Sequence, residues 1–213
     1  IVEEKPSFAR ARVASILEAS PMRADAGRGC LALCGGCPWA HLSYEAQLEA
    51  KRANVADALV RTAHLDAARV EGLVASCAPS KRTWGYRNKL ELGACTGENG
   101  RFMLGFYREG THDLETPDSC PLAHKNIARA PKALRGALRF AQGAQDLGIF
   151  RVGVRGSVRT NDVEVALWTP PGPFPRTHVA GMVKSALKAT SVVRVLADPG
   201  KARKIKGVET LDG

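Results

Sequence analysis

Three cysteines fall within eight residues of the chain, at Cys30, Cys34 and Cys37, in the spacing Cys-x3-Cys-x2-Cys. The sequence before them has no apolar segment like that of a secretion signal, so the cluster indicates a metal site rather than a set of disulfides. Thiolate sulfurs bind iron–sulfur clusters and also zinc. A closed site needs a fourth ligand. Cys120 is the best candidate, because it precedes a proline in a loop, as Cys37 does.

Two other cysteines have no such context. Cys77 lies in a segment of small residues, and Cys95 lies at the end of an expected strand. We expect both to pack as ordinary apolar residues.

Other chemistries share part of this pattern. Radical enzymes that use S-adenosylmethionine have the same Cys-x3-Cys-x2-Cys spacing, but they continue into an alternating strand–helix barrel. A zinc ribbon would require a second Cys-x2-Cys pair, which the sequence lacks. The residue types alone leave iron–sulfur and zinc sites both open.

The charge of the chain favours a polyanionic partner. Its 213 residues hold 31 Lys and Arg against 21 Asp and Glu, a formal net charge of +10. A basic surface of this kind is typical of nucleic-acid binding, and the alternative is a surface kept basic for solubility. No apolar run approaches the roughly 18 residues of a membrane helix, so no membrane partner is expected. Ile1 is not a natural initiator, so we expect the sequence to begin inside a longer, cytoplasmic chain.

The elements that must position these residues alternate between helix and hairpin. Asn99-Gly100 is a strong hairpin signal between two alternating segments. The patterns predict strands over 6–20, 86–95, 102–106, 150–158, 162–168 and 191–196, and helices over 43–62, 127–141 and 179–187. Paired hairpins indicate an α+β fold with a mostly antiparallel sheet, three helices and a cysteine loop. The last stretch holds four basic residues after position 200, which suit either a solvated tail or a connector to a further domain.

Several motifs, in order, resemble the iron–sulfur RNA uracil C5-methyltransferases, whose best-known members modify bacterial 23S ribosomal RNA. The first motif runs from Cys34-Gly35-Gly36-Cys37-Pro38-Trp39 to Lys51. The others are Trp84-Gly85-Tyr86-Arg87-Asn88-Lys89, Gly105-Phe106-Tyr107-Arg108-Glu109-Gly110, Asp118-Ser119-Cys120-Pro121-Leu122, and the segment from Ser191 to Thr210. The resemblance covers nearly the whole chain. The family usually has five residues between its first two cysteines, whereas this chain has three.

The resemblance implies a 4Fe–4S cluster on Cys30, Cys34, Cys37 and Cys120. It implies that residues 1–20 end a small RNA-binding β-barrel, that 21–196 form a central cluster-binding domain, and that 197–213 lead to a catalytic domain. That domain would bind S-adenosylmethionine and supply the nucleophilic cysteine and the base, so no residue of this chain is expected to be catalytic. The implied partner is RNA rather than DNA, with 23S ribosomal RNA expected. The alternative functions are a free-standing iron–sulfur or zinc RNA-binding module and a fragment of a radical enzyme that uses S-adenosylmethionine.

Two segments interleave basic and aromatic residues, as proteins that bind single-stranded RNA do. They are Tyr86-Arg87-Asn88-Lys89 and Phe106-Tyr107-Arg108. We predict that Arg87, Lys89 and Arg108 contact RNA. The alternative is that the arginines make structural ion pairs, for instance with Glu91 or Glu109.

Overall fold

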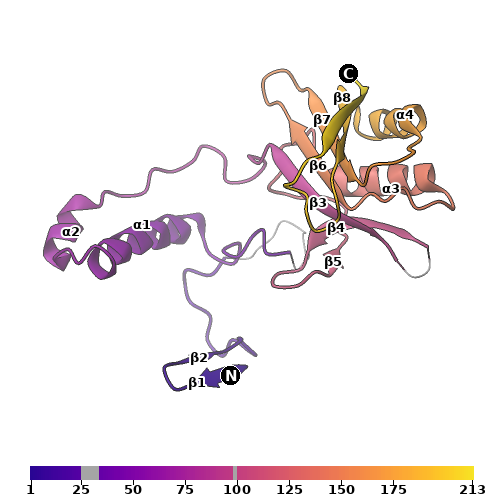
Figure 1. Cartoon of the computed structure of the whole chain (residues 1–213). Coiled ribbons are helices and arrows are strands. Elements are labelled where there is room, and N and C mark those ends of the chain that lie inside the picture. The colour runs from indigo at the N-terminus through magenta and orange to yellow at the C-terminus, as the bar shows by residue number, and fades with distance from the viewer. Residues whose placement is uncertain (25–33, 98–99) are drawn as a thin grey trace. The chain divides into compact units, whose positions relative to one another are not determined.

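The computed structural model describes residues 1–24, 34–97 and 100–213 (Figure 1). The chain divides into two compact units. The first consists of Ile1–Gly27 and Pro38–Pro79, and the second of Arg28–Cys37 and Ser80–Gly213. Within the described ranges, no helix has the length and apolar character needed to cross a membrane.

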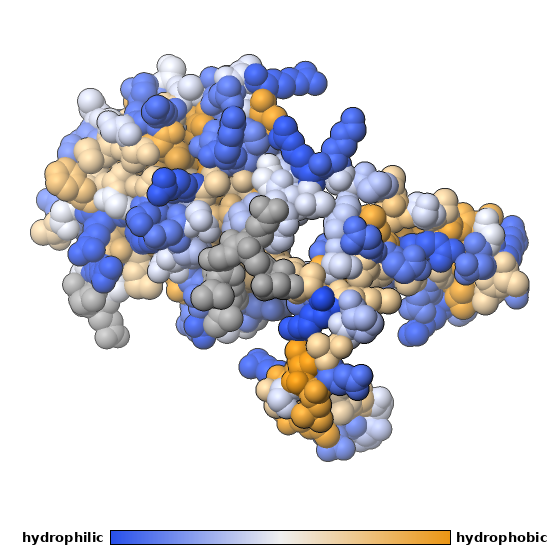
Figure 2. All heavy atoms as spheres, turned by 180° about the vertical axis from the view of Figure 1, so that it is seen from behind, coloured by the Kyte–Doolittle hydropathy of each residue, from blue (hydrophilic) through white to orange (hydrophobic). Residues whose placement is uncertain are grey.

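The first unit begins with a small antiparallel hairpin of β1 (Glu3–Lys5) and β2 (Phe8–Arg10). The expected strand over 6–20 is therefore wrong beyond Arg10, because β1 offers a partner for only three residues. Exposed apolar side chains gather on this hairpin, seen in orange at the bottom of Figure 2. The expected barrel is not among the described elements, which give this unit a two-stranded sheet.

The first unit also holds α1 (Tyr44–Arg61), which confirms the helix predicted from residue 43. The Ser43 hydroxyl accepts a hydrogen bond from the backbone N–H of Ala46, which satisfies one of the free donors at the start of the helix. A second helix, α2 (Ala67–Leu73), was not expected, because seven residues are too few to show a helical period. The described residues thus form four helices rather than three.

The second unit is built on a seven-stranded sheet in the order β5-β4-β3-β6-β7-β8-β9. All neighbouring pairs are antiparallel except β7 and β8, which are joined by a helix. The strands are β3 (Lys89–Thr96), β4 (Phe102–Tyr107), β5 (Leu114–Glu115), β6 (Arg151–Gly156), β7 (Val163–Thr169), β8 (Ser191–Leu196) and β9 (Gly207–Asp212). The two predicted hairpins and the mostly antiparallel α+β sheet are confirmed, and such a sheet is unlike the barrel of radical enzymes.

Two edge strands were missed. The strand β5 has only two residues, and β9 lies within the basic stretch expected to be a connector. Both depend on pairing with a neighbour, β4 for β5 and β8 for β9. Tertiary pairing, rather than a pattern of their own, makes these segments extended.

Two helices, α3 (Ala130–Gln142) and α4 (Arg176–Leu187), cover one face of the sheet (Figure 1). Pro131 lies in the first turn of α3, where a missing N–H costs nothing. The buried side chains between the helices and the sheet form one apolar core, including Leu90, Leu92, Leu104, Leu134, Leu138, Val179 and Val183. Among the described residues of this unit, no helix packs on the opposite face of the sheet.

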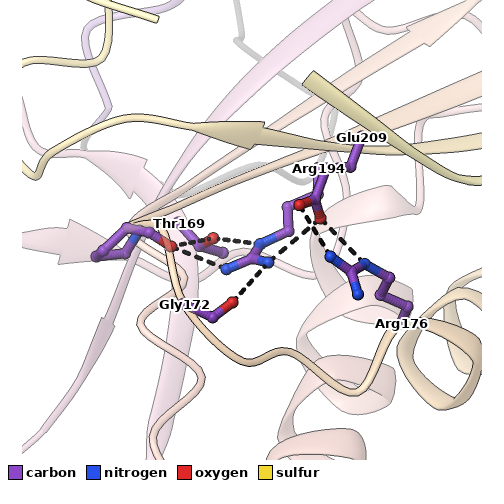
Figure 3. A network of polar contacts seen from close by, with 6 residues as sticks. Thr169, Gly172, Arg176, Arg194 and Glu209 are labelled. Atoms are coloured by element: carbon purple, nitrogen blue, oxygen red, sulfur yellow. Dashed lines mark hydrogen bonds and ion pairs between the residues drawn. The ribbon is translucent and has the colours of Figure 1, made fainter. Parts of the chain in front are cut away.

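A buried arginine joins the end of β7 to β8 and β9. Arg194 is 2% exposed, and its guanidinium donates to the Thr169 hydroxyl at 2.7 Å and to the Pro170 carbonyl at 2.8 Å. It also donates to the Gly172 carbonyl and to the Glu209 carboxylate, which Arg176 binds as well (Figure 3). We call this group the Arg194 clamp. It fixes the loop after β7 to the edge of the sheet.

Candidate functional site

Three of the four predicted cysteine ligands line a single cavity of about 170 Å³ in the second unit. Cys34 and Cys37 come from the loop that precedes the first helix, and Cys120 comes from the loop between β5 and α3. Only Cys120 is fully buried, at 8% exposure. The rest of the cavity wall is mostly apolar and glycine-rich: Gly35, Gly36, Phe106, Tyr107, Pro117, Pro121 and Leu122, with Ser119 and Arg87 as its polar members.

Helix α3 holds the loop that carries Cys120. Arg135 donates to the Pro117 carbonyl at 3.2 Å and to the Asp118 carboxylate at 3.1 Å. Lys132 pairs with the same carboxylate at 2.6 Å. The hydrogen bond from Lys132 is the main reason that the pKa of Asp118 lies below its usual value, so this carboxylate stays ionised and the loop stays attached to α3.

The strand β4 positions the other two cysteines. Cys34 forms an isolated antiparallel bridge with Arg108, the residue that follows β4. The chain then turns tightly, since the Gly36 N–H donates to the Cys34 carbonyl at 2.7 Å. The Cys34 Sγ lies 3.7 Å from the point that a Cβ of Gly36 would occupy, and the Arg87 Nη1 lies 3.9 Å from it. The turn therefore brings a thiol and a cation to the same small space.

A short parallel pairing brings Arg87 to the cysteine cavity. The Gly85 N–H donates to the Pro121 carbonyl, and the Arg87 N–H donates to the Leu122 carbonyl at 2.8 Å. Gly85 has a φ of 66°, a conformation that glycine adopts without strain. The Trp84-Gly85-Tyr86-Arg87 motif thus positions a guanidinium beside Cys120.

Burial raises the pKa of the Cys120 thiol, and the positive charge of Arg87 acts in the opposite direction. A metal ion displaces the proton from a coordinating thiol outright. Cys120 therefore suits a ligand of a metal centre better than a free nucleophile at neutral pH.

The described residues alone do not complete a metal site. Among them, no group of three or more Cys, His, Asp or Glu side chains is close enough together to hold a metal ion. The fourth predicted ligand, Cys30, lies outside the described residues. The donor chemistry nevertheless fits a cluster or zinc, because the described residues of the cavity wall include three thiols and neither a carboxylate nor an imidazole.

The remaining cysteines do not line this cavity. Cys77 belongs to the first unit and is partly buried. Cys95 is exposed on β3, so the expectation that it packs in the core is wrong. In the alternation of β3, Cys95 lies on the face opposite Leu90 and Leu92.

The three predicted RNA contacts are in different surroundings. Arg87 lines the cysteine cavity. Lys89 pairs with Glu91 at 2.6 Å on β3. Arg108 donates twice to Glu115 of β5, with the shorter distance 2.6 Å. Arg108 thus makes an ion pair of the kind that the alternative describes, with Glu115 rather than with Glu91 or Glu109.

Models of known protein families give no match. Individual relatives do. The chain is similar to bacterial RNA methyltransferases. It is 38% identical over 120 residues to an uncharacterized RNA methyltransferase of Bacillus cereus, a match that covers 56% of this chain and 25% of that protein.

Two further relatives extend the match. A Halalkalibacterium halodurans protein, also described as an uncharacterized RNA methyltransferase, is 34% identical over 149 residues, covering 70% of this chain and 30% of its own length. A Staphylococcus aureus protein of the same description is 29% identical over 184 residues, which cover 84% of this chain and 40% of that protein. The chain thus spans between a quarter and two fifths of these relatives.

A solved structure shares the fold. The tRNA (uracil-54, C5)-methyltransferase of Pyrococcus abyssi, solved in complex with S-adenosyl-L-homocysteine, matches with a TM-score of 0.59 at 20% identity. The match covers 92% of this chain and 43% of that structure. It shows that nearly the whole chain shares the fold of part of that structure, and it assigns no substrate.

Proposed function

We propose that the chain is part of an S-adenosylmethionine-dependent RNA methyltransferase that forms 5-methyluridine, with 23S ribosomal RNA as the expected substrate. This segment would bind a 4Fe–4S cluster and help to position the RNA. One observation carries the proposal: thiols from two segments far apart in the sequence, Cys34 with Cys37 and Cys120, line one cavity in a chain similar to RNA methyltransferases.

The proposed cluster ligands are Cys30, Cys34, Cys37 and Cys120. A bound cluster would supply a rigid link between the two cysteine loops, and its binding free energy would add to the stability of the fold. Arg87 would place a positive charge against the thiolate sulfurs, as outer groups that tune such centres do. None of the described residues is proposed as a catalytic group or as a ligand of S-adenosylmethionine. The proposed location is the cytoplasm.

The test is metal analysis of protein purified without oxygen. Wild type should contain about four iron atoms and about four acid-labile sulfides per chain. Cys120→Ala should lose both, because Cys120 is the most buried of the cavity thiols. Cys95→Ala is the matched control, since it removes an exposed thiol outside the cavity and should leave the cluster intact.

Other outcomes would replace the proposal with its alternatives. Full iron occupancy in Cys120→Ala would indicate an open three-cysteine site, as in radical enzymes. Zinc without sulfide would indicate a zinc-stapled RNA-binding module.

The proposed RNA contacts are Arg87, Lys89 and Arg108, and filter binding tests them. Each alanine variant should lower the affinity for RNA and the dependence of that affinity on salt. Arg139→Ala is the matched control, because Arg139 is an exposed cation in the last turn of α3. Affinity and salt dependence equal to the control would remove that residue from the proposed contact surface.

A further inference from the structure

A groove of about 630 Å³ lies on the sheet face that α3 and α4 leave uncovered. Its floor includes Glu91 and Gly93 of β3, which alternate with the core residues Leu90 and Leu92 and therefore face the other way. Its wall is the connection between β8 and β9, which reaches toward β3 (Figure 1). All of these residues belong to the second unit. The groove shares Tyr107 with the wall of the cysteine cavity, but neither Cys120 nor Cys95, the residues changed for the metal analysis, lines it.

The floor presents an aromatic ring. A Cβ at Gly93 would lie 2.6 Å from the Cζ of Tyr107, so the ring of Tyr107 lies directly on the backbone of Gly93. Tyr107 is nevertheless 49% exposed. The edge-on contact with His112, at 6.0 Å between ring centroids, steadies the ring without covering it. The result is a fixed aromatic platform that is open to solvent.

The wall presents cations on an ordered backbone. The Lys201 N–H donates to the Asp198 carbonyl and the Lys204 N–H to the Lys201 carbonyl, and Lys206 closes the loop through its ion pair with Asp198 at 2.7 Å. Within the described part of the chain, no ion pair is formed by the side chains of Lys201, Arg203 or Lys204. These three residues thus line the groove from a loop that backbone hydrogen bonds hold. The charge of Lys201 helps to lower the pKa of Asp198, but that carboxylate is paired with Lys206.

Glu91 is the one carboxylate among the described residues that line the groove, and its charge is already neutralised. Glu91 pairs with Lys89 on its own strand and with Arg151 on β6. These two cations, Lys89 first, hold the pKa of Glu91 below its usual value. Arg151 also lies over the ring of Trp168, at 5.0 Å from the centroid, and is therefore fixed. The groove as a whole keeps an excess of positive charge from Lys201, Arg203 and Lys204.

We infer that this groove, which we call the Tyr107 groove, binds a single-stranded RNA segment, with one base stacked on Tyr107 and backbone phosphates against Lys201, Arg203 and Lys204. The inference rests on the proposed function, which makes RNA the polyanion. An aromatic platform beside unpaired cations is the arrangement that single-strand binders use. A base can lie on the platform only when it is unstacked, so a duplex should bind more weakly.

The test measures binding of a fluorescein-labelled 12-nucleotide RNA to the 213-residue chain purified without oxygen, for the single strand and for the same strand in a duplex. Replacing all three wall cations by glutamine should weaken single-strand binding at least about tenfold. At about 0.7 per phosphate contact for single strands, the salt slope should fall by about 2. The control is the triple glutamine variant of Arg129, Arg139 and Lys188, which removes the same charge from exposed positions in and beside the two helices.

Two single variants isolate the platform. Tyr107→Leu keeps an apolar cover on Gly93 but removes the ring, and should weaken single-strand binding about tenfold while leaving duplex binding unchanged. Tyr107→Phe should bind like wild type. Thermal melting of each variant verifies that the fold is retained.

The outcomes separate this inference from the proposed function. Wild type that binds no RNA would overturn both. RNA binding that the groove triple and the control triple reduce equally would overturn the groove alone. If the triple variant of Lys201, Arg203 and Lys204 lost binding but Tyr107→Leu did not, the proposed stacking of a base on Tyr107 would be wrong. Groove variants that bind RNA normally but no longer bind a protein partner would make the groove a protein interface instead.

Discussion

The Arg194 clamp and the Tyr107 groove use the same side-chain chemistry for opposite purposes. In the clamp, Arg194 is enclosed by carbonyl, hydroxyl and carboxylate acceptors and lies over the ring of Phe174 at 4.5 Å. In the groove, Lys201, Arg203 and Lys204 form no ion pair with any residue that the structure describes, and the exposed ring of Tyr107 lies in the same groove. Satisfied cations hold a fold together, whereas exposed cations held in place without acceptors are available to a ligand.

The largest difference between the two regions should appear in stability. Arg194→Met should lower the free energy of unfolding by about 3 to 5 kcal/mol, because it removes a buried cation and leaves its acceptors without a donor. The matched variant in the groove, Arg203→Met, should change stability by less than about 0.5 kcal/mol, since the Arg203 side chain is exposed. Urea denaturation of both variants measures the difference.

The comparison fails if the two methionine variants are equally stable. That result would mean that water donates hydrogen bonds to the acceptors around residue 194 once the guanidinium is removed. Arg194→Lys refines the test, because a lysine cannot donate to four acceptors in a fork and should restore only part of the loss.

Salt should separate the regions next. Raising the salt from about 50 to 200 mM should weaken RNA binding by more than about tenfold if three phosphate contacts are made. The stability contribution of Arg194 should hardly change, because buried pairs are screened little. RNA affinity that does not respond to salt would contradict phosphate contacts in the groove.

The helices and strands differ in how well the sequence predicts them. The long helix from Ser43 and the two hairpins follow from local signals, a capping serine and alternating apolar residues, and were predicted. The strands β5 and β9 and the helix α2 were not, because they are short and their conformation depends on partners elsewhere in the chain. The strand predicted over 6–20 was wrong for the opposite reason. Its residues alternate, but no neighbouring strand pairs with them beyond Arg10.

The candidate sites show the same limit. The spacing of Cys34 and Cys37 and the Cys-Pro of Cys120 carry a local signal, and these three residues do line one cavity. The Tyr107 groove combines β3, Tyr107 at the end of β4, and a loop far along the chain. The sequence shows these aromatic and basic residues but not that they come together. From the sequence, Lys201, Arg203 and Lys204 suited a tail or a connector. In the structure, pairing of the edge strand β9 with β8 places their loop against β3.

The carboxylates of the two regions can be compared by the same substitution. Glu209 lies beside Arg176 and Arg194, which lower its pKa below the ordinary value of 4.5, with Arg176 the larger cause. Its contribution to stability is therefore complete above about pH 4.5 and is lost as the pH falls through the lowered folded value. Glu209→Gln should be less stable than wild type at pH 7, and the gap should close only in more acidic solution. Thermal melts across pH 3 to 7 measure the gap, and a gap independent of pH would rule out the ion pairs as its cause.

The smallest expected effect is a gain rather than a loss: removing a carboxylate from the groove should raise the affinity for RNA. Glu91→Gln removes the one carboxylate among the described groove residues and breaks its ion pairs with Lys89 and Arg151. RNA affinity should rise about two- to threefold, because an exposed charge interacts with a nearby phosphate by under about 1 kcal/mol. Stability should change little for the same reason, in contrast to Glu209→Gln. The fluorescence binding assay at low salt measures the rise, which should vanish at high salt. A fall in affinity would mean that Glu91 orders the cations for the ligand, and that the groove depends on a satisfied ion pair as the clamp does.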